Sequence, residues 1–209
     1  MRELVSNGLK VLLVEEANRI ARLGLTPMTQ GNLSLLDQNS KLVLITPHDY
    51  PYELMRPDDI VVVDLEGNVK EGRLEPSHET PVHCVVYQQR PGVGGIVHSE
   101  PIWTNCFGAL GKPIQPVFVN MAIDVGGEVP VMPFAPSGNK AFAYEMLRVM
   151  GERNAVIWAN HGLLTVGKTI QKAVRCTVMV EAAAQVYHLA LELGEPSVIP
   201  TDVIQGLIG

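Results

Sequence analysis

The stretch "GGIVHSE" (residues 94–100) carries an apolar run that ends in a histidine and a carboxylate just before Pro101. A short β-branched run after paired glycines predicts a strand. Because side chains alternate faces along a strand, His98 and Glu100 would point to one side and Ser99 to the other. Two potential ligands on one face could hold one metal ion. Most such pairs lie only at a solvated strand end, so predicting a metal site requires further donor residues elsewhere in the chain.

The segments around this strand show hairpin and helix patterns. Apolar runs bounded by turn residues predict strands within 32–47 (two, with a turn at 37–40), 59–72 (a hairpin with its tip at 66–68), 113–123, 128–134 and 154–160. Helical spacing predicts helices over about 3–23, 76–91 (capped by Ser77), 101–110 (ended by Gly111), 137–153 and 170–193. Hairpin strands mixed with helices indicate a single α/β domain over 1–209 around a largely antiparallel sheet.

The composition narrows the class of protein. Of the 209 residues, 46% are hydrophobic and 18% are charged, which suits one globular domain with a full core. A net charge of -6 argues against a nucleic-acid or anionic-membrane partner. Three scattered cysteines without a C-x-x-C pair, and an N-terminus without a signal-like apolar segment, predict reduced thiols in the cytoplasm.

Two of the six histidines end predicted strands. His98 ends the strand already described, and His161 follows the apolar run of "VIWANHGLL" at a glycine-marked turn. Two imidazoles and the carboxylate of Glu100 would suit Zn²⁺, or Mn²⁺ or Co²⁺, with coordination positions left open. The alternative for His161 is that it caps a helix or bonds a backbone carbonyl.

Glu79 is a second carboxylate of interest, because it lies in "EPSHETP" (75–81) where a turn leads into a predicted helix. A helix N-terminus favours an anion, and Glu79 could do only that. The functional alternative is an acid/base carboxylate beside a metal ion, which is the usual device for removing a proton next to a carbonyl.

The order of the motifs along the chain indicates a protein family more specifically than any single motif does. The chain resembles the class II aldolase/adducin-type family, which includes fuculose-phosphate aldolase and ribulose-phosphate 4-epimerase. The resemblance covers roughly residues 5–195 and rests on five segments in sequence: "GNLS" (31–34), "LITP" (44–47), "EPSHE" (75–79), "RPGVGGIVHSE" (90–100) and "NHGLL" (160–164).

This resemblance implies a three-layer α/β/α fold with a central, mostly antiparallel sheet. It also implies a fourfold-symmetric homotetramer with the active site between subunits, and a divalent metal, usually zinc, that stabilises an enolate during C–C bond cleavage. On this resemblance His98 and His161 match two metal-binding histidines. Glu79 matches the glutamate that acts as acid or base and is an optional ligand of the resting metal.

The chain departs from the family at two places. Where the family usually has H-x-H at the strand end, this chain has His98-Ser99-Glu100. Glu100 either replaces the second histidine as a metal ligand or does not coordinate the ion. The phosphate pocket changes as well. His48 and Asp49 stand where the family has small neutral residues after "ITP", and His78 replaces a serine.

The expected substrate-binding residues are therefore Asn32 and Ser77, which match the family pattern, together with His48 and His78, which do not. An aspartate facing a phosphate dianion would cost several kcal/mol if it were desolvated. The two histidines could offset part of that cost or could hold a carboxylate instead.

The sequence thus predicts a divalent-metal-dependent lyase that cleaves a C–C bond through an enolate-type intermediate. The expected substrate is a small hydroxylated or keto carboxylic acid, cleaved by a decarboxylase or aldolase reaction. One alternative is a sugar-phosphate aldolase or 4-epimerase. A second alternative is a non-catalytic, adducin-like assembly module, which would have no need of Glu79, His98 and His161 together.

Overall fold

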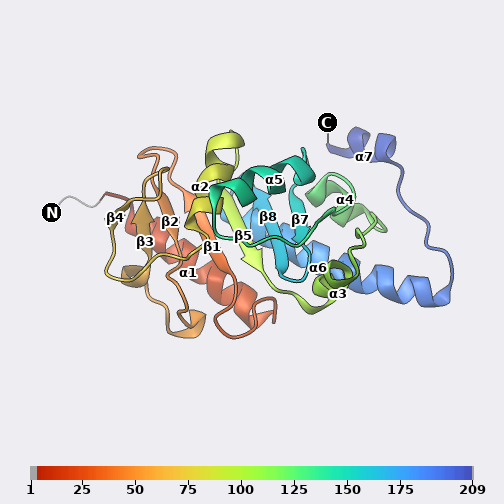
Figure 1. Ribbon diagram of the computed structural model, residues 1–209, viewed down its shortest axis with the longest axis horizontal. Helices are drawn as coiled ribbons and strands as arrows, with labels where there is room; N and C mark the ends of the chain where they lie inside the picture. Colours follow the sequence, from red (N-terminus) through yellow and green to blue (C-terminus); the bar gives the residue numbers. More distant parts are fainter. Residues whose placement is uncertain (1–3, 209) are drawn as a thin grey trace.

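The computed structural model describes residues 4–208 and contains an eight-stranded sheet with helices on both faces (Figure 1). The strand order is β4-β3-β2-β1-β5-β8-β7-β6; β6 and β7 are parallel and the other neighbours pair antiparallel. The strands are β1 (Asn32–Leu36), β2 (Val43–Ile45), β3 (Val61–Val63), β4 (Val69–Glu71), β5 (Gly95–Ser99), β6 (Val131–Met132), β7 (Ala155–Trp158) and β8 (Gly162–Gly167). The prediction of a mostly antiparallel sheet is confirmed.

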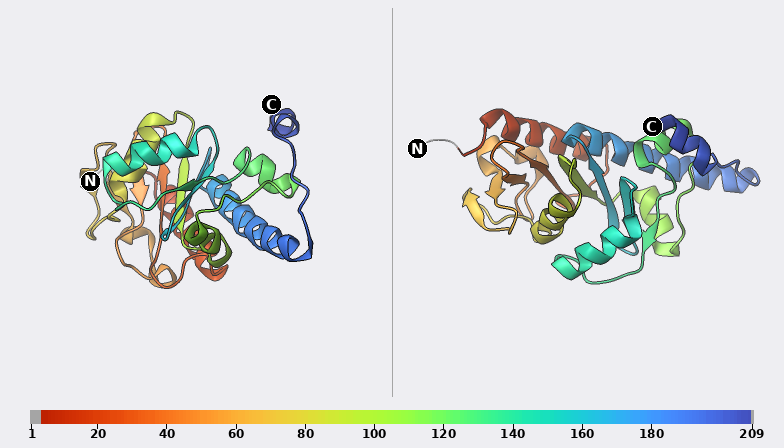
Figure 2. Two further views of the ribbon diagram at one scale, coloured as in Figure 1. Left: turned by 45° about the vertical axis from the view of Figure 1, so that its right-hand side comes forward. Right: turned by 90° about the horizontal axis from the view of Figure 1, so that it is seen from above.

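The helices form a layer on each side of the sheet, so the predicted three-layer α/β/α arrangement is also confirmed (Figures 1 and 2). Helices α2 and α5 pack together over one face, and α1 and α6 cover the other. The helices are α1 (Asn7–Arg22), α2 (Thr80–Gln89), α3 (Ile102–Leu110), α4 (Val119–Val125), α5 (Lys140–Met150), α6 (Ile170–Leu193) and α7 (Thr201–Ile208), with short 3-10 turns at Tyr52–Leu54 and Pro57–Asp59.

The apolar runs of the strands are buried on both faces, and this explains why they do not alternate with polar residues. In β2, Val43 and Ile45 pack with Val82 of α2, whereas Leu44 packs with Leu13 of α1 on the opposite side. All five side chains are fully buried. At roughly 1.5–3 kcal/mol for each fully buried aliphatic side chain, these layers fix the sheet that carries the site.

The structure differs from the sequence predictions in several segments. Helix α1 begins at Asn7 because Ser6 accepts a hydrogen bond from the Gly8 amide at 3.2 Å; residue 3, where the helix was expected to start, lies outside the described residues. Segment 113–123 is not a strand, since most of its second half forms α4. Strand β8 and helix α7 were not predicted.

The predicted Ser77 cap of α2 is wrong. The helix begins at Thr80, after the Glu79 position, and the Ser77 hydroxyl accepts the backbone N–H of Glu79 at 3.2 Å before the helix starts. This contact holds the turn that leads into α2, and it places Glu79 at the helix entrance. Among residues 4–208, none of the helices has the length and apolar character that crossing a membrane requires.

Candidate active site and metal centre

The central strand β5 places His98 between two neighbours. Asn32 of β1 is paired directly with His98, so both side chains lie on the same face of the sheet. On the other side, the Nδ1 of His98 lies 3.1 Å from the carbonyl oxygen of Leu163 in β8. The ring stacks on Trp158 with centroids 4.4 Å apart, and the histidine is only 2% exposed. Packing and a backbone contact therefore fix this imidazole.

Two glycines allow the neighbouring chain segments to approach His98 closely. A Cβ on Gly31, whose φ is +82°, would lie 2.5 Å from the His98 carbonyl oxygen. A Cβ on Gly162 would lie 2.6 Å from the carbonyl oxygen of Ser99 and 2.8 Å from the His98 ring. These distances are shorter than any real Cβ contact, so neither position can hold a side chain. This explains why a glycine precedes Asn32 and another follows His161 in the sequence.

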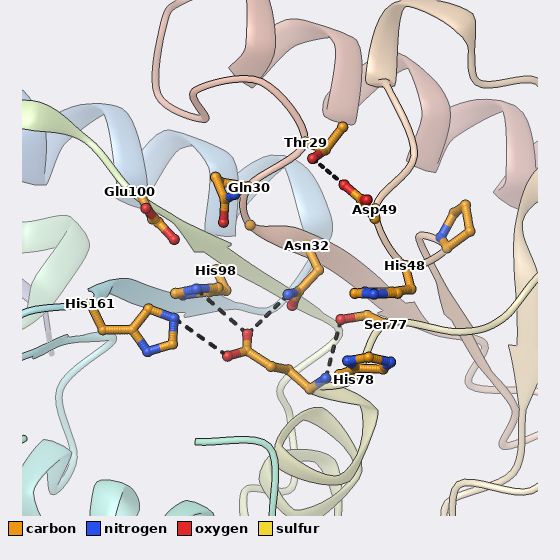
Figure 3. Close-up of a pocket in the computed structure, with 13 residues that line it drawn as sticks. Thr29, Gln30, Asn32, His48, Asp49, Ser77, His78, His98, Glu100 and His161 are labelled. Carbon is orange, nitrogen blue, oxygen red and sulfur yellow. Dashed lines mark hydrogen bonds and ion pairs between the residues drawn. The ribbon is translucent and has the colours of Figure 1, made fainter. Parts of the chain in front are cut away.

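His161 lies in the tight turn between β7 and β8. Asn160 before it adopts a left-handed conformation with φ +58°, and the His161 amide bonds the carbonyl oxygen of Trp158 at 3.0 Å. Its Nε2 lies 3.7 Å from Oε1 of Glu79 (Figure 3). The turn therefore directs the imidazole into the pocket, toward the Glu79 carboxylate.

Glu79 lies between the two histidines at the entrance of α2 and is 8% exposed. Its Oε2 accepts a hydrogen bond from the Asn32 amide at 2.9 Å and lies 3.5 Å from the Nε2 of His98. Its Oε1 accepts a hydrogen bond from the Ser137 hydroxyl at 3.1 Å. The sequence carries no signal for Ser137, since a serine in a Pro/Gly-rich loop does not indicate where its side chain points.

These three side chains fit a divalent cation. Glu79, His98 and His161 each offer one ligand atom, and the atoms lie within 4.8 Å of one another. Adjacent ligand atoms of a tetrahedral zinc site are about 3.4 Å apart, close to the 3.5 and 3.7 Å between the imidazole nitrogens and the Glu79 oxygens. In neutral His98, Nδ1 donates its hydrogen to a carbonyl, so the lone pair of Nε2 faces a carboxylate oxygen. Two acceptors in that position need a cation or a proton between them.

The electrostatics of Glu79 and His161 favour the forms that bind metal. Burial opposes ionisation of Glu79, but His98, the Asn32 amide and His161 outweigh it, and the pKa of Glu79 lies below its ordinary value. Burial, together with His98, lowers the pKa of His161, which favours the neutral imidazole. A carboxylate and neutral imidazoles are the protonation states that coordinate divalent ions.

Glu100 lies in the same pocket but outside this group of three. It follows the last residue of β5, and its amide donates to the carbonyl oxygen of Leu25 at 3.1 Å. Within residues 4–208, the carboxylate and imidazole groups close enough to share an ion are Glu79, His98 and His161, without Glu100 (Figure 3). Burial raises the pKa of Glu100 above its ordinary value.

The outer part of the pocket is built from exposed side chains. The imidazole rings of His48 and His78 stack with centroids 3.6 Å apart, and His78 also contacts Glu75 at 3.1 Å. Asp49 has a left-handed φ of +46°, and its carboxylate accepts a hydrogen bond from the Thr29 hydroxyl at 2.5 Å. The Asp49 charge is thus directed partly toward Thr29 at the rim (Figure 3).

A single pocket of about 180 Å³ joins the two parts of the site. The structure brings every residue that the sequence analysis named for metal and substrate binding into its lining. The lining includes Asn32, His48, Asp49, Ser77, His78, Glu79, His98, Glu100 and His161. Asn32 and Ser77 are buried at its floor, and the Oδ1 of Asn32 has no hydrogen-bond partner within the described part of the chain.

Comparison with known proteins agrees with this geometry. Residues 11–188 match the family described as "Class II Aldolase and Adducin N-terminal domain". The chain is similar to 5-deoxy-D-ribulose 1-phosphate aldolase of Bacillus thuringiensis serovar kurstaki, with 31% identity over 93% of this chain and 91% of that protein. It is 30% identical to L-fuculose phosphate aldolase of Escherichia coli K12, over 94% and 90% of the two chains. A solved L-fuculose 1-phosphate aldolase superposes with a TM-score of 0.92 at 32% identity, covering 98% of this chain and 96% of the other.

Proposed function

The chain belongs to the class II aldolase and adducin family, and on this premise we propose that its pocket cleaves a C–C bond in a small carboxylic acid with the help of a divalent metal ion. Family membership and the aldolase relatives make the chain a metal-dependent carbon–carbon lyase. The non-catalytic assembly module is therefore not retained. The identity of the metal and the acid substrate belong to this proposal.

His98, His161 and Glu79 are the residues that would hold the cation, and zinc suits two imidazoles and a carboxylate. When bound, such an ion acts as a Lewis acid that stabilises negative charge developing on a substrate oxygen. Glu100 borders the same space, where it would stand beside the ion as a further carboxylate.

Glu79 is the proposed acid/base residue. In an aldolase reaction the substrate hydroxyl gives up its proton, and the fragment that carries it leaves as an aldehyde or ketone. In a decarboxylase reaction the carboxylate leaves as CO₂. In both, the electron pair of the broken bond stays on the carbon next to the remaining carbonyl, and that carbon is then protonated. The Glu79 carboxylate is held by Asn32 and Ser137 on the pocket side of the α2 entrance, where it can take up a proton and return one to that carbon. The unpartnered Oδ1 of Asn32 can accept a hydrogen bond from a substrate hydroxyl.

The observation that supports a carboxylate substrate is the pair of stacked imidazoles at the outer end. His48 and His78 offer ring N–H donors, and Asp49 beside them adds a negative charge where the family resemblance implies neutral donors. A carboxylate has one negative charge, so it is repelled less by Asp49 than a phosphate dianion would be. The Ser77 oxygen accepts a hydrogen bond from the Glu79 backbone N–H. Its hydroxyl proton is therefore free to be donated to the substrate carboxylate.

A sugar-phosphate aldolase is the second candidate, and the relatives favour it. The two sequence relatives and the solved structure are all named as sugar-phosphate aldolases, and each matches nearly the whole chain. Asp49 is exposed to solvent and accepts a hydrogen bond from Thr29. Solvent would therefore screen its negative charge, and its repulsion of a phosphate bound at the pocket floor would be weak.

Steady-state kinetics decide between these candidates. We expect fuculose 1-phosphate and ribulose 5-phosphate to be poor substrates, and a hydroxylated or keto carboxylic acid to have the higher kcat/KM. The measurement is kcat/KM for both sugar phosphates and a panel of such acids with the metal-loaded protein. A value above roughly 10⁴ M⁻¹s⁻¹ for a sugar phosphate would make the sugar-phosphate aldolase the correct function.

We also propose that the enzyme works as a homotetramer in the cytoplasm. Large apolar side chains are exposed on two helices. On α3, Ile102 is 71% exposed and Leu110 is 67% exposed; on α6, Leu193 is 92% exposed. The family resemblance implies such an assembly, and these exposed side chains are available for contact between copies. The three cysteines are free thiols, as a reducing compartment favours. Light scattering that finds a stable monomer at micromolar concentration would contradict the assembly.

A further inference from the structure

Ser137 does not line the pocket, yet it contacts the central carboxylate of the site. Its hydroxyl donates to Oε1 of Glu79 at 3.1 Å, while the Asn32 amide donates to Oε2 at 2.9 Å. The Nε2 of His161 is 3.7 Å from Oε1, which is beyond hydrogen-bond distance. Among residues 4–208, Ser137 is thus the hydrogen-bond donor to Oε1, and each carboxylate oxygen has one such donor.

The loop that carries Ser137 (residues 133–139, between β6 and α5) is fixed at its end. Asn139 caps α5 by accepting the amide of Phe142 at 2.9 Å, and its own amide group bonds the carbonyl oxygen of Pro136 at 3.3 Å. Gly138 has φ +84°, and a Cβ there would lie 3.3 Å from the backbone oxygen of His78. The glycine therefore allows the loop to lie against the turn that leads into α2.

Two hydrogen bonds on opposite oxygens restrict rotation of the Glu79 carboxylate about its last torsion. With only the Asn32 bond, Oε1 could turn away from His161 and the group would lose the shape that suits an ion. Residues that orient metal-binding groups typically change metal affinity or activity by about 10- to 100-fold when they are removed. Burial of Glu79 at 8% exposure leaves little water to replace the lost donor.

We infer that Ser137 is a positioning residue that holds Oε1 of Glu79 toward His161, so that loop 133–139 sets the affinity of the site for its metal ion. The inference rests on the proposed function, because it takes the group of three as the metal site. It adds a residue that neither the motifs of the sequence nor the pocket lining points to.

The experiment compares Ser137→Ala with Ser137→Thr, which keeps the hydroxyl, and with Ser40→Ala in the exposed 37–40 turn as a matched control. Apo protein of each variant is titrated with Zn²⁺ against a chromophoric chelator. We expect the zinc dissociation constant to rise about 10- to 100-fold in Ser137→Ala. The Ser137→Thr and Ser40→Ala variants should stay within about threefold of wild type, since they retain the donor to Oε1.

A second readout separates positioning from a general effect on folding. The visible spectrum of the Co²⁺-loaded protein reports the ligand arrangement, and it should change in Ser137→Ala while circular dichroism stays the same. Equal zinc affinity and an unchanged cobalt spectrum in Ser137→Ala and wild type would overturn the inference alone. Wild-type protein that takes up no zinc or cobalt would overturn the proposed metal-dependent function and this inference with it.

Discussion

The inner and outer ends of the pocket are built in different ways. At the inner end, His98 is 2% exposed and Glu79 is 8% exposed, and a strand and a helix entrance hold them against backbone and side-chain partners. At the outer end, His48, Asp49 and His78 are exposed and come from loops. Both ends line the same pocket.

The difference indicates how one scaffold can keep a reaction and change its substrate. A change at the inner end disturbs a buried group in which every member contacts another, so the chemistry there is constrained by packing. A change at the outer end affects exposed loop residues and costs little stability. In this chain Glu79, His98 and His161 match the aldolase pattern, whereas the nearby Glu100 departs from it. At the outer end, His48, Asp49 and His78 also depart from it.

The largest effect is expected from Glu79→Gln at the inner end. This change keeps the size of the side chain and one acceptor oxygen but removes the charge. His98 and His161 should still hold an ion, although more weakly than in wild type. At saturating zinc we expect turnover to fall by about 10²- to 10⁴-fold, the range typical of a general acid–base residue. Single-substrate kinetics and metal analysis check it, with Glu66→Gln at the exposed β3–β4 hairpin tip as the control. Full activity would reduce Glu79 to a helix-entrance residue.

The next largest effect is expected from His161→Ala. Loss of a ligand should weaken zinc binding by more than about 100-fold, the upper value for residues that only orient ligands. His188→Ala is the matched control, because His188 is exposed on α6 and contacts Trp103 rather than the pocket. His98→Ala should behave like His161→Ala, but it also removes a buried ring, so folding has to be checked by circular dichroism. Equal zinc affinity in His161→Ala and wild type would remove that residue from the site.

A smaller effect is expected at the outer end, from the double variant Asp49→Gly with His78→Ser. Glycine fits the left-handed φ of +46° at position 49. Removing one charge near a phosphate is worth about 1 kcal/mol in water, so the ratio of kcat/KM for sugar phosphates over carboxylic acids should rise about fivefold to tenfold. Metal content should not change. An unchanged ratio would show that the outer end does not select the anion.

The placement of the inner-end residues could be predicted largely from the sequence, because the proposed metal ligands lie where regular elements end. Strand periodicity located His98, and a glycine-marked turn located His161. The ordered motifs then identified Glu79. What the pattern could not show is where β5 stops. The strand ends at Ser99, so the alternation that would put Glu100 beside His98 does not extend to it.

Other features depend on contacts between distant segments. Ser137 lies 58 positions from Glu79, and Asp49 lies 20 positions from Thr29, so no local pattern reveals either hydrogen bond. Segment 113–123 was expected to be a strand because it is short, apolar and rich in β-branched residues. Most of its second half instead forms the first part of α4, which Gly126 ends with φ +89°, since short apolar runs of this kind suit a helix equally well.

Metal analysis of the purified wild-type protein tests the central claim most directly, because the proposed reaction requires an ion between Glu79, His98 and His161, and the inner-end geometry suits one. The account predicts about one divalent ion per chain, most abundantly zinc, released by a chelator and taken up again by the apo protein. Protein that is purified without an ion, and that binds no zinc, manganese or cobalt when these are added, would contradict it.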